Sequence, residues 1–336
     1  MYSPEWMRRC PWPERREVSM SARWLSCLWW TAATWVLTTG GLQVGAEPVD
    51  HRQQIVQDDR TVAVSSDGRP VLRYLFAPAQ FKPYVDELYS PAGAQVLRDA
   101  PADHKHHHGL MFAVNVEGVE FWGREDEKCG KQISRGVEGV KAASVDGRGE
   151  SRFTQRLDWV APDGRVLVRE CRTVCVHSRR DLGATVVSWH SRLEPADGRD
   201  SVELSGRNYL GLGVRFVQSM DANGTLVVPG GVAPETDKAG HELYDVPWIA
   251  YVASADDKPV TVALFDSPSN PRHPARMFTM NRPFAYLSAT LGLEKVRLPL
   301  LAGKPLDLRY GVAVLDGPAE AHRIESLYKQ WTALPQ

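Results

Sequence analysis

Four of the ten histidines in the sequence lie within five residues, in the segment Asp103-His104-Lys105-His106-His107-His108-Gly109. Imidazoles titrate near neutral pH, so they can move protons, bind polar ligands or coordinate transition metals. If the segment extends the apolar strand at Leu110 to Val116, His104, His106 and His108 share one face and His107 lies on the other. We expect a rigidly mounted cluster at a pocket rim, with His106 and His107 as the candidates for acid/base chemistry.

Two alternatives for these histidines stay open. His104, His106 and His108 on one strand face would suit a divalent metal, because an H-x-H pair on a strand is one way to hold such an ion. The other alternative is a surface loop with no role. Cys171 and Cys175 lack the C-x-x-C spacing of a zinc knuckle, so we expect small buried side chains there. No cofactor is required, and a divalent metal remains open.

Further polar residues interrupt apolar or proline-rich surroundings. Glu170 and Arg172 alternate with valines on one predicted strand, where they are either a charged pair or solvated. Arg215 lies in an apolar, glycine-punctuated strand, which indicates a paired or ligand-facing guanidinium. A loop pinned by two prolines either holds a polar ligand or only turns the chain, and its polar residues are Asn270, Arg272 and His273.

Period-two alternation of apolar and polar residues runs from residue 60 onward, between turns rich in Gly, Pro and Asp. It is clearest over 152–177, where two strands flank the turn Pro162-Asp163-Gly164. Strands of this kind, with one amphipathic C-terminal helix at 318–333, predict an all-β fold, a large antiparallel β-sandwich of two sheets. The acidic residues at 117, 120 and 125–127 indicate an exposed edge and loop.

The N-terminus has the layout of a signal peptide. Arg23 precedes an apolar run from Trp24 to Leu42, and small residues follow it up to Ala46. We expect residues 1–46 to be an N-terminal extension and signal peptide, with translation starting at Met1 or Met20.

Residues 47–336 are then predicted to form a single domain located in the periplasm or secreted. A membrane anchor is the alternative for the apolar run, but the run is short of the roughly 20 strongly apolar residues that a span needs. We expect no stable membrane insertion after cleavage.

Composition limits the class of partner. The formal net charge is −1, which gives no basic surface for nucleic acid. Hydrophobic residues make up 43% of the chain and charged residues 24%, as in ordinary globular proteins. We therefore expect a small neutral or mildly charged ligand, while the oligomeric state is not indicated.

Several motifs together resemble a known bacterial family. They are D-H-x-H-H-x-G-L at 103–110, Phe121-Trp122-Gly123, Glu170-x-Arg172, the strand 210–216, Asn270-Pro271-Arg272, 283–286 and 309–312. This combination, over most of residues 60–334, is similar to the family labelled methane oxygenase PmoA. A membrane oxygenase needs several spanning helices, and no apolar run of that length follows residue 46, so the label does not suit this chain.

That family is similar in turn to the galactose mutarotase-like β-supersandwich, which includes sugar epimerases, polysaccharide lyases and glycoside-active enzymes. The resemblance implies an exported carbohydrate-active enzyme of epimerase or mutarotase, lyase or hydrolase type, which acts on a carbohydrate or another small molecule. A non-catalytic glycan-binding protein and a metal-dependent enzyme that uses the histidines are the alternatives.

The resemblance also implies roles for particular residues. His106 or His107 would be the acid/base, with Glu170 as the complementary carboxylate. Arg215 and Arg272 would stabilise a developing oxyanion. The family motif often has Arg where this chain has His108, so the imidazole there can bind metal instead of an anion. The remaining residues expected to bind substrate are His104, His108, Arg172, Asn270, Arg272 and His273.

Overall fold

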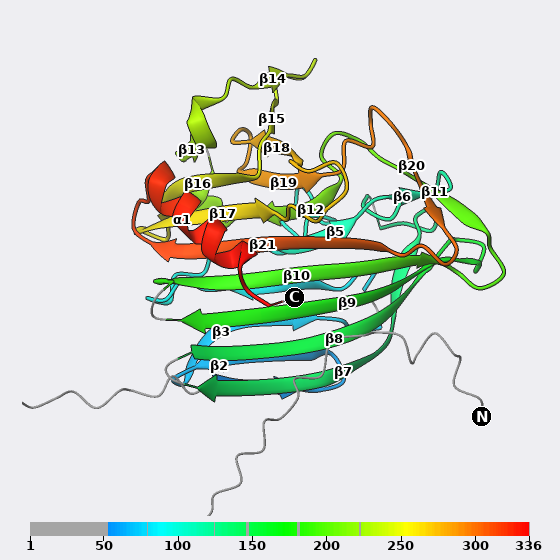
Figure 1. Ribbon diagram of the computed structural model, residues 1–336, viewed down its shortest axis with the longest axis horizontal. Coiled ribbons are helices and arrows are strands. Elements are labelled where there is room, and N and C mark those ends of the chain that lie inside the picture. The colour runs from blue at the N-terminus through cyan, green and yellow to red at the C-terminus, as the bar shows by residue number, and fades with distance from the viewer. Residues whose placement is uncertain are drawn as a thin grey trace, which may run out of the picture. The chain divides into compact units, whose positions relative to one another are not determined.

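Two large antiparallel sheets pack face to face around a shared hydrophobic core (Figure 1). The chain is known from a computed structural model, which describes residues 53–335 except 79, 124, 146, 147, 180, 181 and 222. The predicted signal peptide and the apolar run at 24–42 lie outside the described residues. Within the described part, no helix has the length and apolar character needed to cross a membrane.

The described residues form 21 strands in three sheets. The ten-stranded sheet has the order β1 (Gln53–Gln57), β2 (Thr61–Ser66), β3 (Arg69–Leu75), β4 (Tyr84–Leu88), β5 (Leu110–Ala113), β12 (Gly211–Arg215), β19 (Tyr286–Thr290), β18 (Arg276–Met280), β15 (Glu242–Asp245) and β14 (Glu235–Thr236). The eight-stranded sheet has the order β13 (Thr225–Val227), β16 (Trp248–Ala255), β17 (Lys258–Asp266), β21 (Leu306–Asp316), β10 (Ala184–Pro195), β9 (Val166–Arg179), β8 (Arg148–Val160) and β7 (Lys131–Val145). A small third sheet has the order β20 (Leu298–Leu301), β11 (Ser201–Ser205) and β6 (Asn115–Val116).

The core forms where the inner faces of the two large sheets meet. Phe112 of the ten-stranded sheet packs against Trp159 and Tyr310 of the eight-stranded sheet, with ring centroids 6.1 and 6.4 Å apart. Side chains alternate between the faces of a strand, and register partners share a face. Leu212, the partner of Phe112, therefore also faces the core.

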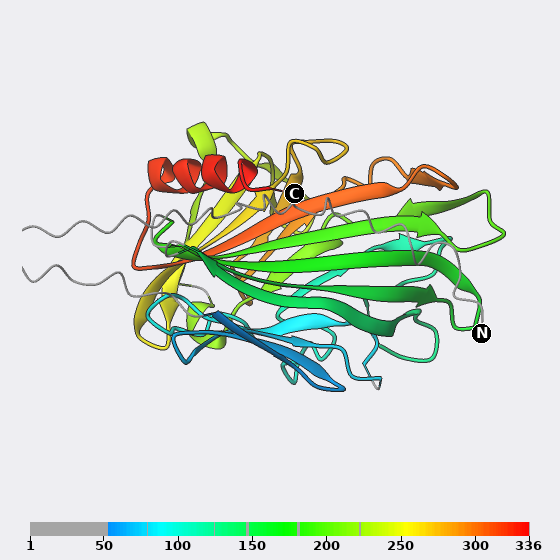
Figure 2. The same ribbon diagram turned by 60° about the horizontal axis from the view of Figure 1, so that its bottom comes forward.

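The only α-helix of the described residues, α1 (Ala321–Thr332), covers the other face of the eight-stranded sheet (Figure 2). Its buried side chains recur at helical spacing, as the sequence predicts, and they are Ile324, Leu327, Tyr328 and Trp331. Two short 3₁₀ turns, Gln218–Met220 and Pro229–Gly231, complete the elements. The predicted all-β fold, an antiparallel sandwich with one C-terminal helix, is confirmed.

Some predicted strands differ in extent. The predicted strand Leu110 to Val116 is divided, because β5 belongs to the ten-stranded sheet and β6 to the small third sheet. Strand β7 was not predicted, because two register shifts against β8 and the glycines at 136 and 139 interrupt its alternation.

Candidate functional site: a histidine and aromatic cluster

The histidine segment forms consecutive turns ahead of strand β5. The amide of His104 donates to the Pro101 carbonyl, and the amide of His107 donates to the His104 carbonyl, each at 2.9 Å. The expectation that residues 104–108 have strand geometry is therefore wrong, because these local hydrogen bonds coil the backbone. As a result, His104, His106 and His107 gather together, and His108 makes separate contacts.

The three gathered imidazoles lie within contact distance of one another. The ring centroids of His104 and His107 are 4.8 Å apart, those of His106 and His107 are 4.6 Å apart, and those of His104 and His106 are 5.9 Å apart. Sequence reasoning identified all three residues, and the turn is what brings His107 to the same side as the other two.

Aromatic side chains from distant parts of the chain surround these rings. The Trp122 ring stands edge-on to His106 and to His107 at 5.5 and 5.1 Å. Phe284 lies 4.7 Å from His104, and Tyr286 lies 5.8 Å from His107. We call His104, His106, His107, Trp122, Phe284 and Tyr286 the histidine–aromatic cluster.

The histidine–aromatic cluster lies on the outer face of the ten-stranded sheet. Tyr286 pairs in register with Arg215, and both alternate with core-facing residues. Gly213, two residues before Arg215, lies under the Tyr286 ring, and a Cβ at position 213 would be 1.9 Å from the Tyr286 hydroxyl. A glycine is therefore needed there for the tyrosine to lie against the strand.

Arg215 supplies a buried positive charge beside the cluster. Its guanidinium carbon lies 3.6 Å from the centre of the Phe284 ring, and the side chain is only 1% exposed. Burial lowers the Arg215 pKa to about 10, partly offset by Asp221, so the group stays charged at neutral pH. Its Nε atom has no hydrogen-bond partner among the described residues.

His106 and His107 are neutral imidazoles at physiological pH. Burial, with the neighbouring cations, lowers the pKa of His106 to about 4 and that of His107 to about 2. Nδ1 of His107 is buried and has no hydrogen-bond partner in the described part of the chain. Because a buried polar atom without a partner is costly, this atom is a candidate contact for a ligand.

His104 has a carboxylate partner. Its Nδ1 lies 3.0 Å from Asp103 Oδ2, and the His104 side chain is 36% exposed. If Nδ1 carries the proton and donates to Asp103, Nε2 is left as an acceptor, as in other carboxylate–histidine pairs. His104 is thus accessible to a ligand and oriented by Asp103.

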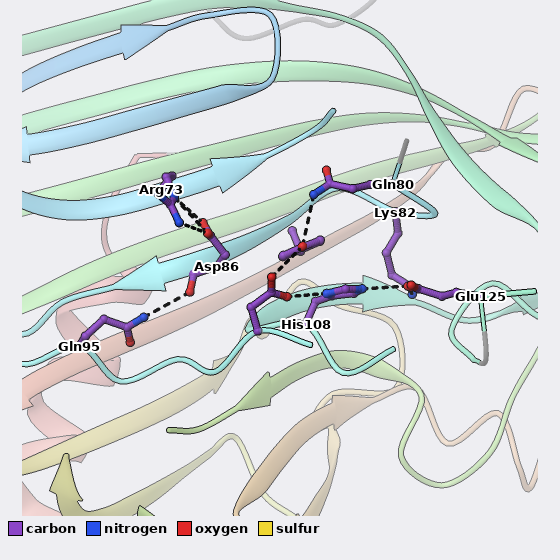
Figure 3. A network of polar contacts seen from close by, with 9 residues as sticks. Arg73, Gln80, Lys82, Asp86, Gln95, His108 and Glu125 are labelled. Atoms are coloured by element: carbon purple, nitrogen blue, oxygen red, sulfur yellow. Dashed lines mark hydrogen bonds and ion pairs between the residues drawn. The ribbon is translucent and has the colours of Figure 1, made fainter. Parts of the chain in front are cut away.

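His108 lies between two carboxylates instead of joining the cluster (Figure 3). Its Nδ1 is 2.6 Å from Asp99 and its Nε2 is 2.9 Å from Glu125, while the Tyr84 ring stacks on it at 4.0 Å. Burial opposes the charge on His108, but the two hydrogen bonds raise its pKa above the usual value. Both ring nitrogens are engaged, which leaves neither for the metal binding or the substrate binding expected of this residue.

Glu125 connects this arrangement to a buried lysine (Figure 3). Lys82, 1% exposed, donates to the Glu125 carboxylate. Although burial raises the Glu125 pKa, His108 and Lys82 together lower it to about 2. The sequence analysis missed this network and placed Glu125 in a solvated loop, because its partners Lys82 and His108 lie in two separate segments with no shared spacing.

Glu170 and Arg172 form an ion pair inside the core. Both side chains are 0% exposed, and Glu170 accepts hydrogen bonds from Arg172, from Trp159 at 2.9 Å and from Ser191 at 2.6 Å. Arg172 also donates to the Tyr74 hydroxyl, the Pro83 carbonyl and the Gln132 amide oxygen. A fully buried, fully bonded carboxylate cannot reach a ligand, so the interpretation of Glu170 as catalytic and of Arg172 as substrate-binding does not fit this structure.

The proline-flanked loop uses its polar side chains to fix the chain. Asn270 is buried and bonds Asp266 and the Arg309 backbone, and His273 Nδ1 lies 2.7 Å from Asp266. Arg272 donates to the carbonyls of residues 291, 296 and 297. These contacts match the structural-turn alternative, and the three residues have no described contact with the histidine–aromatic cluster.

The fold and the site define a class of protein: an antiparallel β-sandwich with imidazole and aromatic rings gathered on the outer face of one sheet. The chain belongs to DUF6807, a family of unknown function whose model matches residues 61–329. The description of this family does not mention methane oxygenase, which is the label of the family that the sequence motifs resemble. No curated protein matches the chain.

Solved structures give a distant similarity to domains of carbohydrate-active enzymes. The galactosidase domain of the α-galactosidase–sucrose kinase AgaSK is 10% identical with a TM-score of 0.45, over 82% of this chain and 43% of that one. A glycoside hydrolase family 97 enzyme from Pseudoalteromonas sp. strain K8, in complex with panose, is 10% identical with a TM-score of 0.34, over 79% and 34%. A galactose mutarotase-related enzyme from Lactobacillus acidophilus is 8% identical with a TM-score of 0.28, over 80% and 99%. The chain thus spans less than half the length of the first two.

Proposed function

We propose that this protein binds a carbohydrate at the histidine–aromatic cluster and acts there as an enzyme on a sugar or glycoside. The observation that carries the proposal is that two partly exposed rings, His104 and His106, lie next to buried aromatic rings and to buried polar atoms without a partner among the described residues. Aromatic rings pack against the apolar faces of sugars, and a few placed polar groups fix the hydroxyls. His107 Nδ1 and Arg215 Nε, without partners among the described residues, are such groups.

The proton-transfer role is assigned to His104 in this proposal. A general base works best when its pKa is near the operating pH, and values of about 4 and 2 make His106 and His107 poor candidates. They would instead bind hydroxyls as neutral imidazoles. His104, oriented by Asp103, would remove a proton from a hydroxyl or from the carbon next to a carbonyl, and Arg215 would stabilise the oxyanion.

A panel of mono- and oligosaccharides, followed by NMR during long incubation, tests the proposal. Turnover should be lost in His104→Ala and reduced in Asp103→Asn, while His190→Ala, on the other sheet, serves as the matched control. Turnover that persists in His104→Ala would refute the assignment.

The low pKa values of His106 and His107 favour one alternative, a glycan-binding protein without catalysis. In that case equilibrium binding should depend on His107 and Trp122, and the bound sugar should stay chemically unchanged. The protein's export through the predicted signal peptide is part of the same proposal, and cell fractionation of the full-length chain tests it.

A further inference from the structure

Three side chains with metal-binding atoms meet on the eight-stranded sheet, on the face that α1 partly covers. Cys175 and His177 are two residues apart on β9, so they point to the same side. Glu150 on β8 pairs in register with His177 and therefore joins them. Figure 1 shows β8, β9 and β10 side by side in this sheet.

The distances between the three ligand atoms are close to those around a zinc ion. His177 Nδ1 lies 3.9 Å from Cys175 Sγ and 3.7 Å from Glu150 Oε2, and the three ligand atoms all lie within 4.8 Å of one another. Tetrahedral Zn²⁺ with its usual bond lengths places sulfur and nitrogen ligands about 3.6 Å apart, and nitrogen and oxygen ligands about 3.3 Å apart. The two His177 distances exceed these values by about 0.3 and 0.4 Å. The Cys175–Glu150 separation, which is within 4.8 Å, would also have to close around the ion. Among the described residues, this is the one group of three such side chains that meets the distance criterion.

A second layer of contacts orients the histidine. His177 Nε2 lies 3.0 Å from Ser188 Oγ, and Ser188 Oγ accepts a hydrogen bond from the Trp331 indole at 2.9 Å. If His177 Nε2–H donates to Ser188, the lone pair of Nδ1 faces Cys175 and Glu150. Metal-binding histidines commonly have their second nitrogen held in this way.

The donor set also selects the kind of ion. A thiolate, a carboxylate and a neutral imidazole carry a total charge of about −2, which balances a divalent cation. Sulfur and nitrogen ligands favour zinc or another late transition metal over magnesium or calcium. Three protein ligands leave a fourth position open for water or another molecule.

We propose that Glu150, Cys175 and His177 form a binding site for Zn²⁺ or a similar transition-metal ion. The site lies on a different sheet from the histidine–aromatic cluster and is independent of the proposed carbohydrate function. It also revises the sequence-based expectation that Cys175 is only a small buried side chain.

Metal titration of the purified full-length protein tests this site. After treatment with a chelator, Zn²⁺ is added in competition with a chromophoric chelator, and Co²⁺ is added in parallel. We expect one high-affinity Zn²⁺ per chain and a thiolate-to-cobalt charge-transfer absorption. This absorption reports a cysteine ligand, so it separates the site from any metal bound by the clustered histidines.

Variants make the assignment specific. Cys175→Ser should abolish the charge-transfer absorption, His177→Gln and Glu150→Gln should weaken Zn²⁺ binding at least tenfold, and Ser188→Ala should weaken it by about 10- to 100-fold. Cys129→Ser, which alters the other free thiol among the described residues, should change nothing. Glu150 is only partly buried, so its variant keeps the test valid if the others do not fold. Fewer than about 0.1 Zn²⁺ per chain, or unchanged affinity in both Glu150→Gln and His177→Gln, would overturn the proposal.

Discussion

Variants of the buried ion pair Glu170–Arg172 test whether these two residues stabilise the fold or take part in catalysis. Removing one partner leaves the other charge at 0% exposure with no counterion. Breaking a buried ion pair in this way costs roughly 3–5 kcal/mol. A domain of this kind has only about 5–15 kcal/mol of total stability, so either single variant should be severely destabilised.

A double-mutant cycle measures the coupling energy between Glu170 and Arg172. In Glu170→Gln, the new amide N–H faces the Arg172 guanidinium, where a carboxylate oxygen accepted a hydrogen bond before. We expect the free energy of unfolding to fall by about 3–5 kcal/mol. In Arg172→Met, the Glu170 charge remains buried, and Tyr74 and Gln132 lose a donor, with a similar loss. The double variant buries no charge, and its cost should be smaller than the sum of the single costs by about 2–3 kcal/mol.

Urea denaturation measures each free energy of unfolding. Glu203→Gln, at an exposed pair with Arg297, is the control and should cost about 0–1 kcal/mol. If the losses of the two single variants sum to the loss of the double variant within about 0.5 kcal/mol, Glu170 and Arg172 are not energetically coupled and the prediction is wrong. Loss of carbohydrate turnover in a well-folded Glu170→Gln variant would restore the catalytic interpretation of this residue.

Three further predictions concern the site and its surroundings. Burial lowers the pKa of His107 from 6.5 to about 2, so between these pH values the unfolded chain binds more protons than the folded chain. The urea concentration at the unfolding midpoint should therefore fall as pH drops below about 6.5. This fall should be smaller in His107→Gln. Although burial opposes it, the hydrogen bonds to Asp99 and Glu125 raise the pKa of His108, so its contribution to stability is present below the ordinary histidine pKa and is lost as pH rises through the folded value. Arginine stays charged over this range, so His108→Arg should lose less stability than the wild type as the pH is raised. Trp122→Ala should weaken glycan binding in calorimetry about two- to tenfold, while Trp122→Phe retains most of the affinity; equal binding by all three proteins would exclude ring stacking.

The sequence predicts the fold well because alternation is a local signal. Phe153, Leu157 and Trp159 alternate with polar residues, and all three are fully buried in the core, as their pattern indicates. The C-terminal helix is predicted for the same reason, although it begins at Ala321 instead of 318. Domain boundaries, export and the roles of the site residues remain predictions.

The site is predicted only in part because it depends on contacts between distant segments. Alternation with valines places Glu170 and Arg172 on one face of a strand, but a core ion pair and a ligand-facing pair give the same pattern. The direction of His108 depends on Asp99 and Glu125, which lie in loops on either side of β5 and β6. No periodic signal relates these carboxylates to the histidine.

The contact between Gly213 and Tyr286 fixes where the tyrosine ring lies in the histidine–aromatic cluster. The tyrosine lies flat against β12 because position 213 has no side chain, and a single methyl group there would overlap its hydroxyl. Alanine at this position would displace the tyrosine ring within the histidine–aromatic cluster, while every imidazole kept its identity. If the cluster binds a carbohydrate as proposed, a change of one carbon atom at residue 213 would alter ligand selectivity, even though this residue has no polar group with which to contact a ligand.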